Sequence, residues 1–295
     1  RQRFAEAPRG VVQICHGLAE HGARYGRFAE ALAQNGYHAY LQDHRGHGVN
    51  IGAHAPKGMV AQKLGHDVAT GDVAALNAHI RRSHPGLPVV LFGHSMGGLI
   101  ALNTLISYPG TADAAAIWNA NFGDGLTNRT ALALLYMERM LKGSDVPSSI
   151  LPKLTFSAWG KSVPHHRTLF DWLSRDGAEV DAYIADPLCG FDPTVALWID
   201  IFRMMQRGAD DANFRNILKT MPIHLIGGTD DPATDKGGAV RRLAQRLHGR
   251  GFHNVTCTLM PGTRHESLND LDRDAVTQNF LDWLAQTLPS APLRG

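Results

Sequence analysis

The sequence predicts an α/β fold, in which a mostly parallel sheet is flanked by helices and carries a helical cap insertion. Three observations lead to this prediction. Short β-rich runs alternate with longer segments of helical periodicity near both ends of the 295-residue chain, the helical segments between strands close with glycine, and the alternation stops between about residues 120 and 219. Because alternating strands and helices are typical of parallel sheets, we expect both ends to build one sheet and the middle to lie over it.

The first part of the expected sheet comes from short apolar runs before the insertion. Four strands are expected, at Val11–Cys15, Tyr37–Asp43, Pro88–Gly93 and Ala114–Asn119. Residues 24–36 and 67–86 lie between the first three of these strands, and each segment is long enough for a crossover helix. A third helical pattern, at residues 98–107, follows the third strand directly.

The same alternation returns near the other end of the chain. We expect strands at Pro222–Gly228 and Val255–Gly262 and helices at residues 236–251 and 274–288. The predicted organisation is therefore an α/β core of residues 1–119 and 220–295 with a helical cap insertion of residues 120–219. The insertion is rich in Trp, Phe, Leu and Met, and we expect a subset of these side chains to line an apolar tunnel.

Composition excludes several classes of function. The 29 Lys and Arg residues nearly balance the 27 Asp and Glu residues, so the net charge of +2 gives no long-range field for nucleic acid, and no nucleic-acid partner is expected. No run of apolar residues is long enough to cross a bilayer, and the first ten residues lack the apolar region of a signal peptide. The 3 cysteines are far apart and odd in number, which fits a reducing compartment, and we expect a cytoplasmic protein.

The stretch Gly93-His94-Ser95-Met96-Gly97 fits the pattern G-x-S-x-G between an apolar strand and a helix. A sharp strand-to-helix turn of this kind holds the serine in a strained conformation with its hydroxyl exposed, and side chains at either glycine would crowd the turn. The alternative is a glycine-rich turn whose serine caps the helix. The context favours Ser95 as a nucleophile.

A serine nucleophile needs a histidine base and an acid that orients this base. In this fold the acid comes first in the chain after the serine and the histidine comes second, each in a loop after a strand. The strand at 222–228 is followed by two adjacent carboxylates, Asp230 and Asp231, of which only one can orient the base. Either the other carboxylate or Asp235 could cap the next helix. His265 follows the last strand and is the last histidine of the chain, so it is the candidate base.

The 16 histidines raise the question of a metal site. The pair His44 and His47 lies in a turn-like segment, and the chain has no His-Glu-x-x-His helix, so no metal is expected. Residues 43–48 are expected to form a structured loop that shapes the pocket wall. Glu20 and Arg24 follow the turn after the first strand, and they either pin that loop or bind a polar part of the substrate; pinning is favoured.

Six motifs occur along the chain in the order found in one protein family. They are HGLAEHGARY (16–25), DHRGHG (43–48), GHSMGG (93–98), ADPLCG (185–190), GGTDDPATDKGGA (227–239) and PGTRHE (261–266). In these motifs the chain resembles the α/β-hydrolases of the monoacylglycerol lipase and lysophospholipase type, also described as serine aminopeptidase-like hydrolases. The resemblance implies the α/β-hydrolase fold with a helical cap after Asn119.

The resemblance also implies roles for individual residues. Ser95 becomes the nucleophile, Asp231 the acid and His265 the base, while the backbone N–H groups of Leu18 and Met96 form the oxyanion hole. No cofactor is implied. His94, beside the nucleophile, and Asn119, at the end of its strand, join Glu20 and Arg24 as candidates for substrate binding.

The expected function is a serine hydrolase that cleaves a single-chain lipid ester, such as a monoacylglycerol or lysophospholipid, through an acyl-enzyme. One alternative keeps the triad and acts on small acyl substrates as a carboxylesterase, thioesterase or amidase. A remote alternative is a catalytically silent binding protein. The apolar helix expected over Ala131–Leu141 either packs inward, which is favoured, or gives the cap a weak membrane-surface contact. The sequence indicates no oligomeric state.

Overall fold

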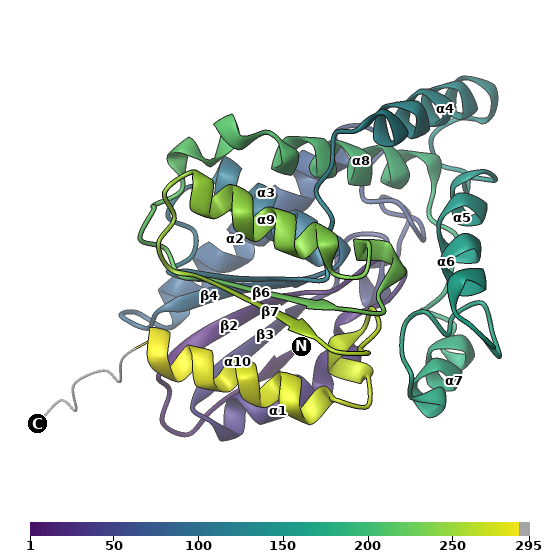
Figure 1. The fold of residues 1–295 in the computed structure, drawn as a ribbon. Coiled ribbons are helices and arrows are strands. Elements are labelled where there is room, and N and C mark those ends of the chain that lie inside the picture. Colours follow the sequence, from purple (N-terminus) through teal and green to yellow (C-terminus); the bar gives the residue numbers. More distant parts are fainter. Residues whose placement is uncertain (289–295) are drawn as a thin grey trace, which may run out of the picture.

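A computed structural model describes residues 1–288 of the chain, which form one seven-stranded sheet between two layers of helices (Figure 1). The strands lie in the order β1-β3-β2-β4-β5-β6-β7. Their bounds are β1 (Gln2–Arg3), β2 (Gly10–Cys15), β3 (Tyr37–Gln42), β4 (Val89–His94), β5 (Ala114–Trp118), β6 (Ile223–Gly228) and β7 (Val255–Met260). Only β1 pairs antiparallel, with β3, and every other pair is parallel. The expected α/β-hydrolase fold is confirmed.

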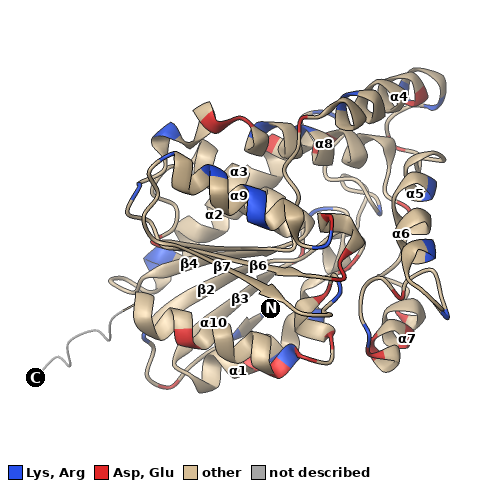
Figure 2. Cartoon of the chain, in the orientation of Figure 1, with Lys and Arg blue, Asp and Glu red and all other residues tan. Residues whose placement is uncertain are grey.

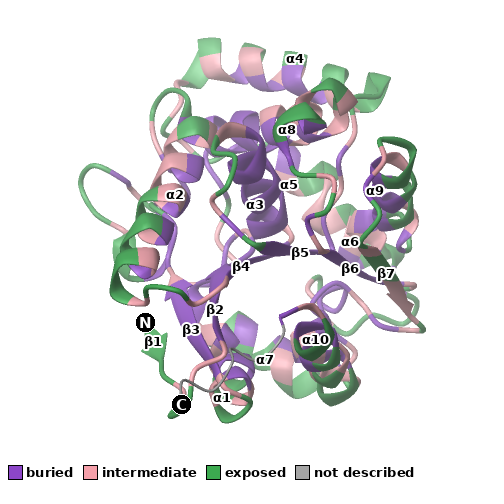
Figure 3. Cartoon of the chain, turned by 90° about the vertical axis from the view of Figure 1, so that its left-hand side faces the viewer, coloured by how far each residue is buried: buried purple, intermediate pink, exposed green. Residues whose placement is uncertain are grey.

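The core helices cover both faces of the sheet, as Figure 3 shows from its edge. One face is covered by α1 (Gly26–Gln34) and α10 (Arg273–Thr287), and the other by α2 (Gly65–Ser83), α3 (Met96–Ser107) and α9 (Gly238–Gly249). The strands β2, β4, β5 and β6 are buried throughout, because helices cover them on both sides. This explains why they appear in the sequence as continuous apolar runs rather than as alternating patterns.

Five helices lie between β5 and β6 in the chain, and of these α5, α6 and α7 stand beside the carboxyl ends of the strands (Figure 1). The five are α4 (Leu126–Lys142), α5 (Leu151–Leu154), α6 (Phe156–Ser162), α7 (Gly177–Ala185) and α8 (Val195–Ala209). Short 3-10 helices complete the described chain at η1 (Gly22–Tyr25), η2 (Gly48–Asn50), η3 (Asp211–Asn216), η4 (Pro232–Thr234) and η5 (Ser267–Asn269). Helix α8 packs against α4 and also against the core helices α2 and α3.

Helix α4 has two apolar faces. Ala131, Leu132 and Leu135 are buried, so this part of the helix packs inward. Met140 and Leu141 are 87% and 84% exposed, and they lie on the opposite side. Both basic and acidic residues are scattered over the core and over the helices between β5 and β6 (Figure 2). Among residues 1–288, none of the helices combines the length and apolar character needed to cross a membrane.

Candidate active site

The turn between β4 and α3 holds Ser95 in a conformation that few side chains adopt. Its backbone has φ 54° and ψ −119°, and its side chain makes no capping hydrogen bond to the helix. A Cβ atom at Gly97 would collide with the carbonyl oxygens of Cys15 and His16, and a Cβ atom at Gly93 would collide with the backbone of Gly97. Both glycines are therefore required by close backbone contacts, and the serine is not a capping residue.

Ser95, His265 and Asp231 form a hydrogen-bonded chain. The Ser95 hydroxyl lies 2.8 Å from His265 Nε2, and His265 Nδ1 lies 2.9 Å from Asp231 Oδ2. Since the carboxylate can only accept, His265 carries its proton on Nδ1 and Nε2 accepts from the hydroxyl. Asp231 and His265 follow β6 and β7, and parallel strands bring these loops to the same edge of the sheet.

The carboxylate of Asp231 is fully buried and is held by several donors. Thr234 Oγ1 donates to Oδ2 at 2.7 Å, and Asn119 Nδ2 donates to the same oxygen at 3.1 Å. Burial alone would raise the pKa of Asp231, but the charge and hydrogen bond of His265, with the bonds from Asn119 and Thr234, lower this pKa below its ordinary value. Asp230 is exposed, so it is Asp231 that faces His265.

Asn119 belongs to the carboxylate's surroundings as well as to the cavity. Its Oδ1 accepts a hydrogen bond of 2.9 Å from the Ser267 hydroxyl, while its amide donates to Asp231. Its backbone is left-handed, with φ 47°, a region that Asn tolerates better than most residues. The supporting roles of Thr234 and Ser267 were not expected from the sequence, because neither hydroxyl stands out from other polar loop residues.

Leu18 and Met96 lie next to Ser95 at the floor of the cavity. Met96 is the first residue of α3, and Leu18 stands in the turn after β2. Neither backbone N–H donates a hydrogen bond to another described residue. Two N–H groups beside a serine hydroxyl, one of them at a helix N-terminus, can donate hydrogen bonds to an oxygen atom that develops negative charge and so stabilise it.

Glu20 and Arg24 lie behind this turn, and their polar atoms contact protein groups. Glu20 accepts hydrogen bonds from the Gly17 N–H at 2.5 Å, from the Tyr25 hydroxyl at 2.7 Å and from Arg24 at 3.0 Å. Arg24 also forms a two-pronged ion pair with Glu266, one prong of which is 2.8 Å long. These contacts fit the pinning interpretation. His94 lines the cavity, and its Nε2 contacts the backbone carbonyl of His265 at 2.9 Å.

The expected loop at 43–48 is held by its acidic and basic side chains. Asp43 accepts hydrogen bonds from the N–H groups of Gly22 and Val49, at 2.7 and 3.0 Å, and Arg45 pairs with Asp72. The rings of His44 and His47 lie tilted against that of His16, with centroids 4.5 and 5.2 Å from it. Burial lowers the pKa of all three imidazoles, that of His47 to about 3. These histidines are therefore neutral, buried supports of the turn.

One group of possible metal ligands lies near this turn. The donor atoms of His21, Asp186 and Cys189 lie within 4.8 Å of one another. His21 Nε2 and Asp186 Oδ2 are hydrogen-bonded at 2.8 Å, and the Gly190 N–H donates to the Ala19 carbonyl at 2.9 Å. The loop after α7 is thereby tied to the turn that contains Leu18.

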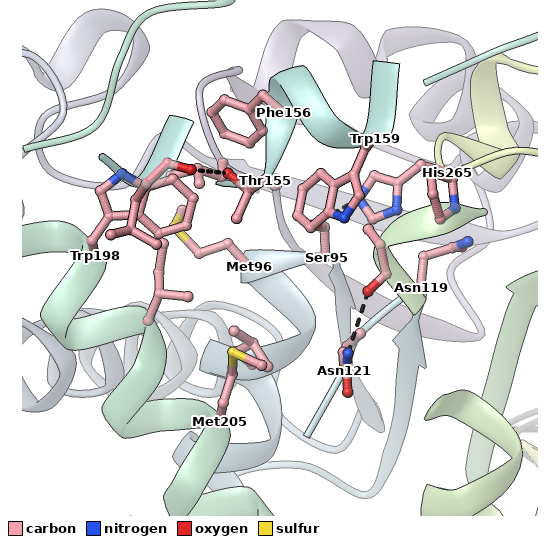
Figure 4. Close-up of a pocket in the computed structure, with 18 of the residues that line it drawn as sticks. Ser95, Met96, Asn119, Asn121, Thr155, Phe156, Trp159, Trp198, Met205 and His265 are labelled. Atoms are coloured by element: carbon pink, nitrogen blue, oxygen red, sulfur yellow. Dashed lines mark hydrogen bonds between the residues drawn. The ribbon is translucent and has the colours of Figure 1, made fainter. Parts of the chain in front are cut away.

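A cavity of about 640 Å³ opens above Ser95 (Figure 4). The cap contributes most of its wall, including Phe156, Trp159, Phe170, Trp172, Trp198, Phe202 and Met205. Polar side chains are fewer, and Asn121 lies on the side of the cavity near Asn119. The cavity is thus large enough for a lipid-sized ligand, mostly apolar, and closed at its floor by the serine.

Comparison with known proteins identifies the family. Residues 6–272 match the family described as serine aminopeptidase, S33. The chain is 28% identical to monoacylglycerol lipase of Mycolicibacterium smegmatis over 283 residues, which cover 95% of this chain and 90% of that protein. It is 33% identical to phospholipase YtpA of Bacillus subtilis over 274 residues, which cover 92% and 93% of the two chains.

A solved structure shares the whole architecture. The carboxyl esterase of Bacillus coagulans, solved in complex with glycerol, superimposes with a TM-score of 0.85 at 25% identity, over 97% of this chain and 93% of that one. The matched segment of the present chain includes β2 to β7 and the cap helices between β5 and β6. The chain therefore belongs to the serine aminopeptidase family of α/β-hydrolases.

Proposed function

We propose that this protein cleaves carboxylic esters of single-chain lipids, a monoacylglycerol or a lysophospholipid, through an acyl-enzyme. The observation that carries the proposal is the hydrogen-bonded chain of Ser95, His265 and Asp231, which opens onto an apolar cavity of about 640 Å³. The relatives support the substrate class, since one is a monoacylglycerol lipase and another a phospholipase.

The proposed reaction assigns a role to each polar group of the floor. Ser95 Oγ attacks the ester carbonyl while His265 takes the hydroxyl proton, and Asp231 stabilises the imidazolium that forms. The N–H groups of Leu18 and Met96 stabilise the oxyanion, and losing one such donor costs roughly 3–4 kcal/mol of transition-state stabilisation. His265 then protonates the leaving alcohol and activates the water that releases the fatty acid.

The cap supplies the acyl site in this proposal. Residues 120–219 act as a cap over a core of residues 1–119 and 220–288, and the aromatic wall of the cavity binds the acyl chain; residues 289–295, which the sequence also assigned to the core, lie outside the described residues. Each buried methylene contributes about 0.8 kcal/mol of binding. Asn121 lies on the side of the cavity near Asn119, where a glycerol or phosphate ester head group can be solvated.

The decisive experiment compares the wild type with Ser95→Ala on monoacylglycerols, lysophospholipids and short-chain p-nitrophenyl esters. We expect the wild type to prefer single-chain lipids and the variant to lose activity on all substrates, with an unchanged thermal unfolding temperature as control. A preference for acetate esters would favour the carboxylesterase alternative. Activity in Ser95→Ala would overturn the mechanism, and a Ser95 that resists a fluorophosphonate probe would indicate a silent binding protein.

We also propose a weak membrane-surface contact through α4. Its outer face carries Met137, Met140 and Leu141, all exposed, with Arg139 and Lys142 beside them. Flotation with neutral and anionic liposomes should carry the wild type upward more than Met140→Glu/Leu141→Glu. Equal flotation of the two proteins would remove this part of the proposal.

The proposed site of action is a reducing compartment such as the cytoplasm. Cys15, Cys189 and Cys257 are all unpaired thiols, which persist where disulfides do not form. Fractionation of cells that make the protein tests this proposal, and recovery in an oxidising compartment would contradict it.

A further inference from the structure

His94 lies directly beneath the base and touches it through the backbone. Its Nε2 is 2.9 Å from the carbonyl oxygen of His265, and the centroids of the two rings are 5.0 Å apart. A carbonyl oxygen can only accept, so Nε2 of His94 must carry a proton. The remaining question is whether the other ring nitrogen, Nδ1, carries one as well.

The Tyr25 hydroxyl answers this question because it has a single proton and two neighbours. Its oxygen is 2.7 Å from Glu20 Oε1 and 3.1 Å from His94 Nδ1. Glu20 also accepts from the Gly17 N–H and from Arg24, so it is ionised and has no proton to give. Tyr25 therefore donates to Glu20, and its lone pair is left to accept a proton from Nδ1 of His94.

The charges of the surrounding groups lead to the same result. Arg24 faces two carboxylates, Glu20 and Glu266, and all three side chains are nearly buried. One cation against two anions leaves one buried negative charge uncompensated, which is costly. The other histidines near these carboxylates are His16, His44 and His47, whose pKa values are lowered by burial, and His265, which is hydrogen-bonded to Asp231. Only His94 is placed to supply the second positive charge.

The directions of two pKa shifts also support a positively charged His94. Burial alone would lower the pKa of His94, but the carboxylate of Glu20, 3.7 Å from Nδ1, raises it above its ordinary value. Burial alone would raise the pKa of Glu20, but His94 and Arg24 hold it well below its usual range.

We propose that His94 is held as an imidazolium at neutral pH and positions His265 against the turn that carries Leu18. This inference rests on the proposed function only for its effect on catalysis. Nε2–H holds the carbonyl of the base, while Nδ1–H reaches the turn through Tyr25, Glu20 and the Gly17 N–H. A Cβ atom at Gly17 would press on both Glu20 and His94, so only glycine leaves room for this link. One charged side chain thus couples the base to the oxyanion turn.

Nitrogen NMR of the uniformly ¹⁵N-labelled wild type tests the charge without any substrate. We expect His94 to show two protonated ring nitrogens at pH 7.5, and the signal to be assigned by its absence in His94→Gln. A non-protonated ring nitrogen on His94 at that pH would overturn the inference. Because the measurement needs no turnover, it stands whether or not the proposed function is correct. If the variant folds poorly, the ring signals can be assigned on the wild type by through-bond correlation to the His94 backbone.

Kinetics of His94→Gln test the positioning role. Glutamine keeps an N–H donor for the His265 carbonyl but loses the charge, which leaves the buried cluster with one excess negative charge. We expect kcat to fall at least tenfold with little change in KM, and the acid limb of the kcat/KM profile to move to higher pH because the excess negative charge favours a protonated base. His253→Gln, at an exposed histidine, is the matched control and should leave both unchanged. An unshifted profile and an unchanged kcat in His94→Gln would contradict the role.

Discussion

The floor and the wall of the cavity are built in opposite ways. On the floor, Ser95, His265 and Asp231 all have hydrogen-bond partners inside the protein. In the wall, Trp172 and Trp198 each bury an indole N–H that has no partner among the described residues. The floor therefore depends on a few polar contacts, so the change of a single atom there can abolish activity. The wall depends on apolar area shared by many side chains, so single changes there should have graded effects.

The largest effect is expected on the floor, at the acid. Asp231→Asn replaces an acceptor oxygen by an amide that cannot hold His265 in the required tautomer, and kcat should fall about 10⁴-fold. Asp230→Asn is the matched control, because this neighbouring carboxylate is exposed and makes no hydrogen bond to His265. Ester hydrolysis by the two purified variants decides the matter, and equal losses would refute the assignment of Asp231.

The second largest effect tests the backbone beneath the floor. In Gly97→Ala the new methyl group meets the carbonyl oxygens of Cys15 and His16, and the free energy of unfolding should fall by about 3 kcal/mol. Gly249→Ala, where a Cβ atom meets nothing within 4 Å, should be neutral or slightly stabilising. Urea unfolding of both variants measures the difference. A Gly97→Ala protein as stable as the wild type would mean that the turn is not tightly packed.

A smaller effect concerns the histidines that support the floor. Burial, with the nearby imidazole of His16, lowers the pKa of His47 from 6.5 to about 3. Between these two pH values the unfolded chain binds more protons than the folded one, so the free energy of unfolding falls as the pH falls. The slope is about 1.4 kcal/mol per pH unit for each such histidine. Urea unfolding at several pH values should show a shallower slope in His47→Phe, and an equal slope would show that His47 does not contribute.

The smallest effect is expected in the wall. Trp159→Ala enlarges the cavity, so the preferred acyl chain should become longer, while kcat/KM on the best wild-type chain drops about tenfold or less. Activity on an acetate ester should hardly change, because the floor is intact. A series of p-nitrophenyl esters measures the shift, with Leu218→Ala, at an exposed leucine outside the cavity, as control. A loss as large as that of Asp231→Asn would erase the distinction between floor and wall.

The same distinction explains what could be predicted from the sequence. Six strands were found because each is a short β-rich run, although β7 is only partly buried, and β1, two polar residues long, was missed. Ser95 was recognisable because its turn demands glycine at fixed positions on both sides. The choice of Asp231 over Asp230 needed the family resemblance, since adjacent residues of a loop carry no periodicity that tells which one points inward.

The residues of the wall could not be predicted, because the side chains that face the cavity depend on how each cap helix is rotated about its axis. Trp159 and Met205 line the cavity, whereas Met140, equally apolar and in the same insertion, points to solvent. Apolar spacing along α4 is compatible with either face being buried, and the short helices α5 and α6 are too short to show a period.

Helix α8 limits how this protein can be re-engineered or diversified. It contributes Trp198, Phe202 and Met205 to the wall of the cavity. It also packs on α2 and α3, and it returns the chain toward β6. A chimera that exchanged the entire insertion would replace a structural member of the core together with the specificity elements. The natural splice point lies before Thr194, which caps α8 through its hydroxyl. Segments upstream of that residue can be traded between relatives only if the face of α4 that packs on α8 is kept, and α8 must evolve in step with the helices beneath it.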